Sequence, residues 1–376
     1  MFTVLMAVAM FVGAAVMALV LLASNAPDAL VVGVLLAALP VGPVIAAYLW
    51  LDRYEPEPLG LLATAFGWGA LVATAAALVL QAIDQFAFGT TTSLAAATVA
   101  PVTEEAAKGL FVLILLWFRR NELDGILDGI VYAGLVGIGF AFTENILYLA
   151  GAYMGNTGDS AGGLGSATGL FVVRGIFSPF AHPLFTSFTG IGVGIAVTTL
   201  SRPWRFLAPA LGYVAAVVAH AAWNASAFFS GGQAFVVTYF VAMVPAFLLV
   251  AGFAVWARGR EGRMLTRSLN DCADRGFLAP QEVPWLVRLP ARRAARHLAR
   301  ADGGPLGERV MREYQQQAIE LGFLHHRYLR GTAPADFVQR GSAMVQRLQA
   351  LRPYVRFPQQ VGTYPLSSGP QWEGTP

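Results

Sequence analysis

Residues 94–118 read LAAATVAPVTEEAAKGLFVLILLWF, an apolar run with three ionisable side chains near its middle. A helix of about 20 apolar residues crosses a hydrocarbon core about 30 Å thick. Glu104, Glu105 and Lys108 would therefore lie inside the membrane, where a charge costs a few kcal/mol or more. Charges kept at such a cost usually serve a function. This run predicts both a membrane fold and a buried functional site.

The composition of the whole chain is that of a membrane protein. Of its 376 residues, 56% are hydrophobic and 12% are charged, whereas soluble globular chains carry about 25% charged residues. The single cysteine, Cys272, excludes an internal disulfide framework, and its place in the polar C-terminal part argues against a catalytic thiol. We expect the lipid bilayer as a partner, and no nucleic acid.

Eight apolar runs are each long enough to cross a bilayer. The predicted fold is therefore an all-α polytopic membrane bundle of about eight transmembrane helices, followed by a cytoplasmic helical tail. The first run lacks the charged start of a signal peptide, so we expect it to be retained. The expected spans are Phe2–Leu22, Leu30–Leu51, Leu59–Ile83, Leu94–Phe118, Ile126–Ala150, Leu170–Leu200, Phe206–Phe229 and Ala234–Ala257.

Arginine occurs in every second connection between these runs. It follows the second, fourth, sixth and eighth runs, and the other connections contain neither lysine nor arginine. The positive-inside rule then places both termini in the cytoplasm and the loop Gly151–Gly169 outside, in a multi-pass protein of the cell membrane. Three regions are predicted: a transmembrane core over 1–257, an arginine-rich helical region over 258–357, and a disordered tail over 358–376.

Two pairs of glycines are spaced for close helix packing. Gly125 with Gly129 and Gly190 with Gly194 each form a GxxxG pattern. Such patterns let two helix backbones approach closely in lipid, although glycine is also simply frequent in membrane helices.

Four polar clusters recur at one depth in different spans. They are Glu104-Glu105-Ala-Ala-Lys108, Phe140-Ala-Phe-Thr-Glu144-Asn145, His182 and His220-Ala-Ala-Trp-Asn224. Counted from the cytoplasmic ends, helix rise places each roughly 20–30 Å deep, in the outer half of the membrane. Buried polar residues can simply hold helices together, but agreement among four helices predicts a common site.

Spacing within the clusters suggests how the groups divide their work. Glu104 and Lys108 are one turn apart and can pair. The two adjacent glutamates point about 100° apart, so we expect one to do chemistry and the other to support it. His220 and Asn224 share a helix face, which suits metal binding or stabilisation of an oxyanion. Arg174 is a candidate partner for Glu144 or an interface anchor.

These motifs together resemble the PrsW family of intramembrane proteases. The resemblance covers roughly Leu30–Ala257 and includes the turn Asp52-Arg-Tyr-Glu-Pro-Glu-Pro58 and the motif Ala-His182-Pro-Leu-Phe-Thr. PrsW proteins are similar to the CAAX-processing and bacteriocin-processing membrane proteases, whose second motif ends in histidine where this chain has Glu144. The resemblance implies cleavage of a membrane-anchored protein, such as an anti-sigma factor, on its extracytoplasmic side.

The expected chemistry is hydrolysis of a peptide bond. Glu104 or Glu105 would activate water as a general base, and Glu144, His182 and His220 would bind zinc. In the alternative without metal, a glutamate activates water while His220 and Asn224 stabilise the oxyanion. The non-enzymatic alternative is a proton- or ion-coupled transporter or channel that uses the same buried groups.

Overall fold

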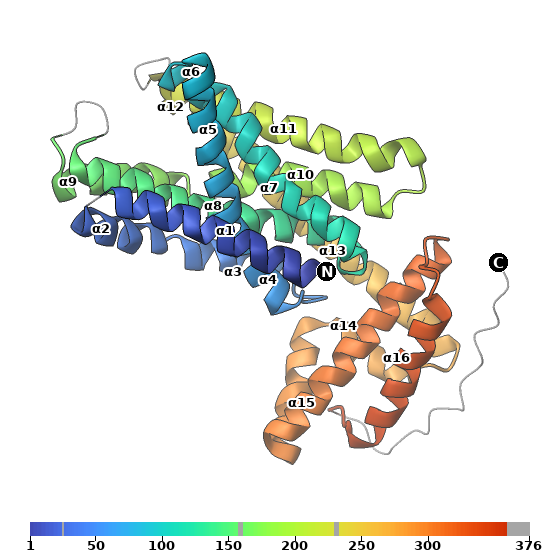
Figure 1. Cartoon of the computed structure of the whole chain (residues 1–376). Coiled ribbons are helices and arrows are strands. Elements are labelled where there is room, and N and C mark those ends of the chain that lie inside the picture. The colour runs from blue at the N-terminus through green and yellow to red at the C-terminus, as the bar shows by residue number, and fades with distance from the viewer. Residues whose placement is uncertain (25, 157–160, 229–232, 359–376) are drawn as a thin grey trace. The chain divides into compact units, whose positions relative to one another are not determined.

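The computed structural model describes residues 1–24, 26–156, 161–228 and 233–358, so the predicted disordered tail lies almost entirely outside the described residues. Every regular element in these ranges is a helix, which confirms the all-α prediction (Figure 1). The chain forms two compact units. One contains Met1–Asp52 and Glu57–Val255, and the other contains Arg53–Pro56 and the chain from Trp256 onward.

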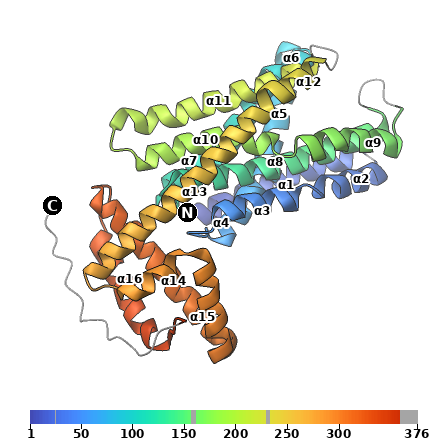
Figure 2. The ribbon, with the colours of Figure 1, turned by 180° about the vertical axis from the view of Figure 1, so that it is seen from behind.

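The first unit is the membrane core. Figure 2 shows from behind its long helices and α13, which leads from the first unit into the second. Its helices are α1 Phe2–Ala23, α2 Pro27–Ala38, α3 Val41–Leu51, α4 Leu59–Gly67, η1 Trp68–Ala73, α5 Thr74–Phe88, α6 Thr92–Ala97, α7 Val99–Phe118, η2 Arg120–Glu122, α8 Ile126–Met154, α9 Gly163–Phe171, η3 Val172–Phe177, α10 Ala181–Thr198, α11 Arg202–Phe228, α12 Gln233–Thr238, η4 Tyr239–Met243 and α13 Val244–Asp274.

Seven helical stretches in the described ranges are long and apolar enough to cross a membrane. They correspond to seven of the eight expected spans. The remaining one, expected at Leu94–Phe118, forms α6 and α7, and α7 has 20 residues but carries two glutamates and a lysine. The seven stretches are Phe2–Ala23, Pro27–Leu51, Leu59–Phe88, Ile126–Met154, Gly163–Thr198, Arg202–Ala227 and Gln233–Asp274. The prediction of a polytopic helical membrane protein is thereby confirmed.

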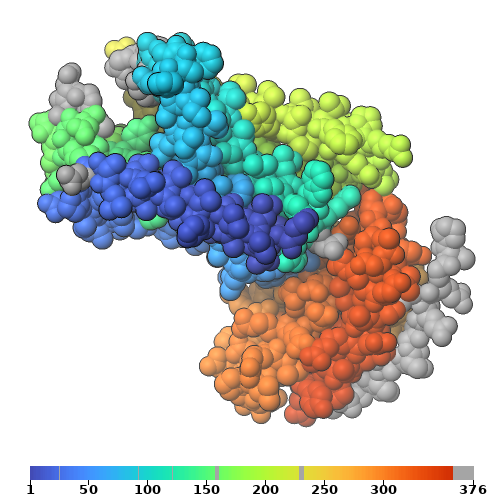
Figure 3. Space-filling view, in the orientation of Figure 1, coloured from blue at the N-terminus to red at the C-terminus, as the bar shows by residue number. Residues whose placement is uncertain are grey.

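Helix α8 is the centre of this unit, and 20 of its 29 residues are buried. It crosses α10 at the predicted glycines, because a Cβ on Gly129 would overlap the carbonyl oxygen of Gly190. A Cβ on Gly139 would likewise overlap the carbonyl oxygen of Phe66. By contrast, only four of the 22 residues of α1 are buried, and α1 lies on the face seen in Figure 3, as suits a helix in contact with lipid.

Several spans are interrupted where the sequence predicted continuous helices. The run Leu30–Leu51 is divided into α2 and α3 next to Pro40, since proline removes a backbone donor. The run Leu170–Leu200 passes through the π-helical turn η3 and a break at 178–180 before α10 begins. π-Helical turns occur frequently at functional sites, and the break at Pro179 opens α10 close to His182.

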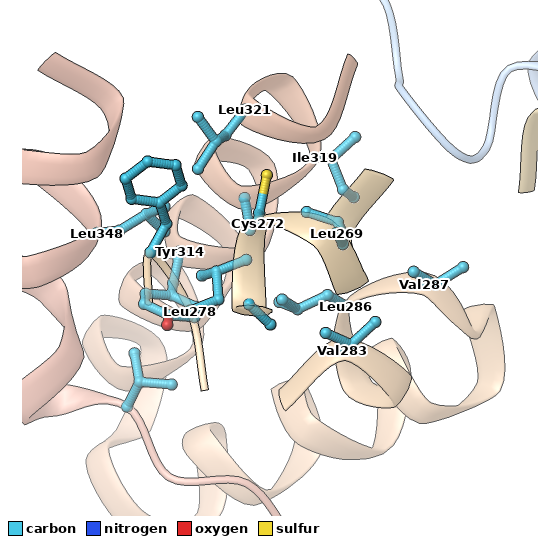
Figure 4. Packing of buried hydrophobic residues seen from close by; sticks show 14 of the residues in the cluster. Leu269, Cys272, Leu278, Val283, Leu286, Val287, Tyr314, Ile319, Leu321 and Leu348 are labelled. Atoms are coloured by element: carbon cyan, nitrogen blue, oxygen red, sulfur yellow. The ribbon is translucent and has the colours of Figure 1, made fainter. Parts of the chain in front are cut away.

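The second unit has its own hydrophobic core (Figure 4). It is built from the C-terminal part of α13 with η5 Pro280–Glu282, α14 Val283–Val287, α15 Leu289–Leu329, α16 Phe337–Leu351 and η6 Arg352–Tyr354. Cys272 lies inside this core, where burial raises the pKa of its thiol to about 12. Tyr54, from the turn between α3 and α4, packs against the same core. Residues Arg53–Pro56 of this turn therefore belong to the second unit.

Candidate active site

Helix α7 supplies a buried charge cluster. Glu104, Glu105 and Lys108 are 5%, 0% and 0% exposed. The Lys108 ammonium lies 2.8 Å from Oε1 of Glu105 and 3.4 Å from Oε2 of Glu104. Buried charges persist when they are paired and hydrogen-bonded, so Lys108 is the counter-ion of both carboxylates. The predicted pairing with Glu104 is confirmed, and the shorter contact is with Glu105.

The two glutamates have different surroundings. Glu105 is enclosed: its Oε2 accepts a hydrogen bond from Thr186 at 3.0 Å, and its Oε1 lies 3.0 Å from Nδ1 of His220. Glu104 lines a cavity, and its Oε1 accepts a hydrogen bond from Gln81 at 3.2 Å. The geometry therefore gives Glu104 access to a reactant and gives Glu105 a supporting position.

The two histidines come from the first turn of α10 and the middle of α11. The rings of His182 and His220 lie 5.0 Å apart and nearly perpendicular, and Phe185 stacks on the His220 ring. Glu104, His182 and His220 each offer one ligand atom, and these three atoms lie within 4.8 Å of one another. This group brings together residues from α7, α10 and α11.

Glu144, on α8, lies beside this group. Its Oε2 is 2.8 Å from Nε2 of His182 and also forms an ion pair with Arg174. Arg174 is therefore a partner of Glu144, one of the two roles expected for it. The carboxylate grouped with the two histidines is Glu104, although Glu144 was the ligand expected from the sequence.

Asn224 lies one turn beyond His220 and lines the same cavity as Glu104. Its side-chain amide donates a hydrogen bond of 2.8 Å to the carbonyl oxygen of Ala96, in α6. The amide is thereby held at the wall of the cavity.

The cavity beside these residues has a volume of about 530 Å³. Small-molecule sites commonly occupy 300–1,000 Å³, so the space can admit a few side chains of a peptide. Seven alanines line it, together with these polar or charged residues: Thr74, Gln81, Gln85, Glu104, Glu144, Asn145, Arg174, Ser178, His182 and Asn224.

Two contributors to the site were not predicted from the sequence. Gln81 is a polar residue in an apolar run of α5, and Thr186 follows His182 by one turn. A glutamine within a membrane span is a signal in its own right, because its amide needs partners in lipid. The threonine belongs to the motif around His182 but carries no charge to mark it.

The donor set fits a catalytic metal ion. Catalytic zinc takes three protein ligands, commonly histidine and carboxylate, and leaves a position for water. Metal-bound histidines usually have their second nitrogen held by a carboxylate, and here Glu144 contacts His182 and Glu105 contacts His220. Three carboxylates face two permanent cations, Lys108 and Arg174. With all three carboxylates ionised and the histidines neutral, the cluster would carry one excess negative charge, which would favour a further cation.

A second acidic group lies near the other end of α8. Asp52, Glu57 and Asp128 each offer a carboxylate oxygen within 4.8 Å of the others. Asp128 precedes Glu144 by 16 residues of α8, about 24 Å of helix. Burial is the main cause that raises the pKa of Asp52 to about 8 and that of Glu57 to about 10. Glu57 also accepts a hydrogen bond from Tyr132 at 2.7 Å. These pKa values indicate that Asp52 and Glu57 are protonated at neutral pH.

Comparison with known proteins identifies the family. The family model described as PrsW family intramembrane metalloprotease matches residues 57–250, slightly more than half of the chain. This range contains every residue of the candidate site. Among relatives named Protease PrsW, the one from Geobacillus kaustophilus is 29% identical over 172 residues, covering 46% of this chain and 70% of the relative.

Two further relatives bear the same name. The one from Oceanobacillus iheyensis is 30% identical over 161 residues, covering 42% of this chain and 67% of the relative. The one from Bacillus subtilis is 28% identical over 116 residues, covering 31% of this chain and 53% of the relative. No solved structure matches the chain. The match over more than half of its length, with the buried site inside that range, makes this multi-pass membrane protein a member of the PrsW family of intramembrane metalloproteases.

Proposed function

We propose that the chain is a zinc-dependent endopeptidase that cleaves a membrane-anchored protein near the extracytoplasmic side of the cell membrane. The observation that carries the proposal is the grouping of Glu104, His182 and His220 beside a cavity of about 530 Å³. An anti-sigma-factor-like protein is the substrate class that we favour. Membership of a protease family favours this function over a transporter or channel.

Glu104, His182 and His220 would hold the zinc ion. When bound, zinc supplies a Lewis acid and a water molecule whose pKa is lowered to near 7. Glu105 and Glu144 would fix the orientation of the two imidazoles, because each contacts a ring nitrogen. Asn224, at the cavity wall, would orient the carbonyl group of the substrate.

A metal-free mechanism is the second candidate, and the position of Lys108 favours it. Its ammonium lies 3.1 Å from Nδ1 of His182 and also contacts both glutamates, so a permanent cation already sits among the same groups. Glu104 would then take a proton from the attacking water as a general base. His220 and Asn224 would stabilise the oxyanion.

Metal analysis combined with a cleavage assay separates the two mechanisms. The full-length protein is purified in detergent, its zinc content is measured, and cleavage of a fluorescently labelled single-span peptide is followed. The zinc mechanism requires about one zinc per chain, loss of cleavage with a chelator and recovery with added zinc. Full cleavage by metal-free protein would leave only the glutamate mechanism.

The proposed orientation has its own test. Both termini are expected in the cytoplasm because arginine gathers in every second connection. Reporter enzymes fused after the tail and within the loop Gly151–Gly169 should report opposite sides of the membrane. The same side for both would contradict the orientation.

A further inference from the structure

Arg174 makes three contacts with one turn of α8. Its Nε donates a hydrogen bond of 2.6 Å to Oδ1 of Asn145, and its Nη2 pairs with Oε2 of Glu144. Its guanidinium also lies 4.1 Å from the ring centre of Tyr148. Arg174 belongs to the π-helical turn η3, directly before the break that precedes α10. It thus links the interrupted span to the central helix.

Glu144 contacts both Arg174 and His182. The same oxygen, Oε2, accepts from Arg174 and lies 2.8 Å from Nε2 of His182. His182 is the second residue of α10, next to the break. The position of its ring therefore depends on side-chain partners, and Glu144 is the partner on the Nε2 side.

The chemistry of arginine suits this position. The Glu144 side chain is only 16% exposed, so a carboxylate there needs a cation close by to stay ionised. The planar guanidinium can contact the carboxylate and the neighbouring amide at once, whereas a lysine ammonium acts as a single point charge. Arg174 can hold Glu144 in one place as well as keep it charged.

We propose that Arg174 is a positioning residue of the protease: it fixes Glu144, and through Glu144 it sets the ring orientation of His182. The inference rests on the proposed function, in which His182 belongs to the active site. It differs from direct substrate binding, which Arg174 could also perform from the cavity wall. The two roles predict different kinetic effects.

A double-mutant cycle tests the proposal with the full-length protein and a fluorescently labelled single-span peptide. Arg174→Gln and Glu144→Gln should each lower kcat by about 10–100-fold, the usual effect of losing a supporting contact to a histidine of this kind. KM should change less than twofold. Because both residues act through one contact, the double variant should be no worse than the poorer single variant.

Two further variants complete the design. Arg174→Lys keeps a cation beside Glu144 but cannot also hold Asn145, so it should recover only part of kcat. It also serves if Arg174→Gln fails to fold. Arg202→Gln, which removes an exposed arginine at the start of α11, should leave kcat unchanged. Multiplied effects in the double variant, a raised KM with normal kcat, or no recovery in Arg174→Lys would each overturn the positioning role. An unimpaired His182→Ala variant would instead overturn the proposed active site.

Discussion

Oε1 of Glu105 lies 3.0 Å from Nδ1 of His220, so one glutamate of the adjacent pair supports a histidine while its neighbour lines the cavity. This division follows from helix geometry, because successive side chains point about 100° apart. Lys108 contacts both carboxylates and allows two charges to remain buried on one helix. The pair therefore has two functions that substitution can separate.

Glu104→Gln should lower kcat by about 10²–10⁴-fold, because it removes the general base of the metal-free mechanism or one of the three proposed ligands of the zinc mechanism. Glu105→Gln should also impair cleavage, but mainly by loosening His220, with a loss of about 10–100-fold. Both variants are assayed with the same single-span peptide after confirming normal insertion. Near-normal cleavage by both would contradict the assignment of this pair to the site.

His182→Ala and His220→Ala should each lose bound zinc together with cleavage, since each removes one of three proposed ligands. The measurement is the zinc content of purified protein, compared with that of the exposed-histidine variant His297→Ala. Zinc retained at the wild-type level in both site variants would show that the metal, if bound, lies elsewhere.

Lys108→Met should destabilise the membrane core by about 3–5 kcal/mol, the usual cost of leaving a buried ion pair with one partner. The two glutamates would remain in a fully buried setting without their cation. Thermal unfolding in detergent measures the loss. Arg119→Met is the matched control, because its side chain is 46% exposed and its contact with Glu122 is 4.0 Å long. Equal unfolding temperatures for the two variants would contradict the role of Lys108.

Much of the site follows from local spacing in the sequence. Glu104 and Lys108 are one turn apart, as are His220 and Asn224, and helix rise alone places both groups at a similar depth. The crossing of α8 and α10 at Gly129 and Gly190 could also be predicted, because small residues let two helices approach closely in lipid.

The sequence alone could not show which carboxylate lies with the two histidines. Whether Glu104 or Glu144 joins the two histidines depends on side-chain directions across different helices, and the break at Pro179 changes where α10 begins. Gln81 was missed because an uncharged polar side chain does not mark a buried site as an ionisable residue does in lipid. The attachment of residues 53–56 to the tail region was also missed, since a charged, proline-rich turn reads as an exposed loop.

The free energy of unfolding should fall as the pH rises, because of the acidic group of Asp52, Glu57 and Asp128 near the start of α8. The pKa of Asp52 is raised to about 8, mainly by burial, so the folded protein keeps a proton that the unfolded chain releases near pH 4. The stabilisation is complete below about pH 4 and is lost as the pH approaches 8. Glu57, whose pKa is raised to about 10, extends the loss further.

The measurement is the unfolding temperature in detergent between pH 5 and pH 8. One retained proton changes the free energy of unfolding by about 1.4 kcal/mol per pH unit. Asp52→Asn should make the decline shallower, whereas Asp28→Asn, at an exposed position in α2, should not. A decline of equal slope in the wild type and Asp52→Asn would show that Asp52 is not protonated in the folded state.

Arg292→Ala should loosen the tail region together with the turn at 53–56. The Arg292 guanidinium is buried and donates hydrogen bonds to the carbonyl oxygens of Tyr54 at 2.9 Å and Arg53 at 3.4 Å. Removing it leaves these acceptors without a donor, at a cost of about 1–3 kcal/mol. Hydrogen exchange should therefore become faster both in α15 and in the turn. Arg293→Ala is the matched control, because the neighbouring arginine is exposed and its loss should change neither region. Faster exchange in α15 with an unchanged turn would mean that the turn is held by Tyr54 packing, without a contribution from Arg292.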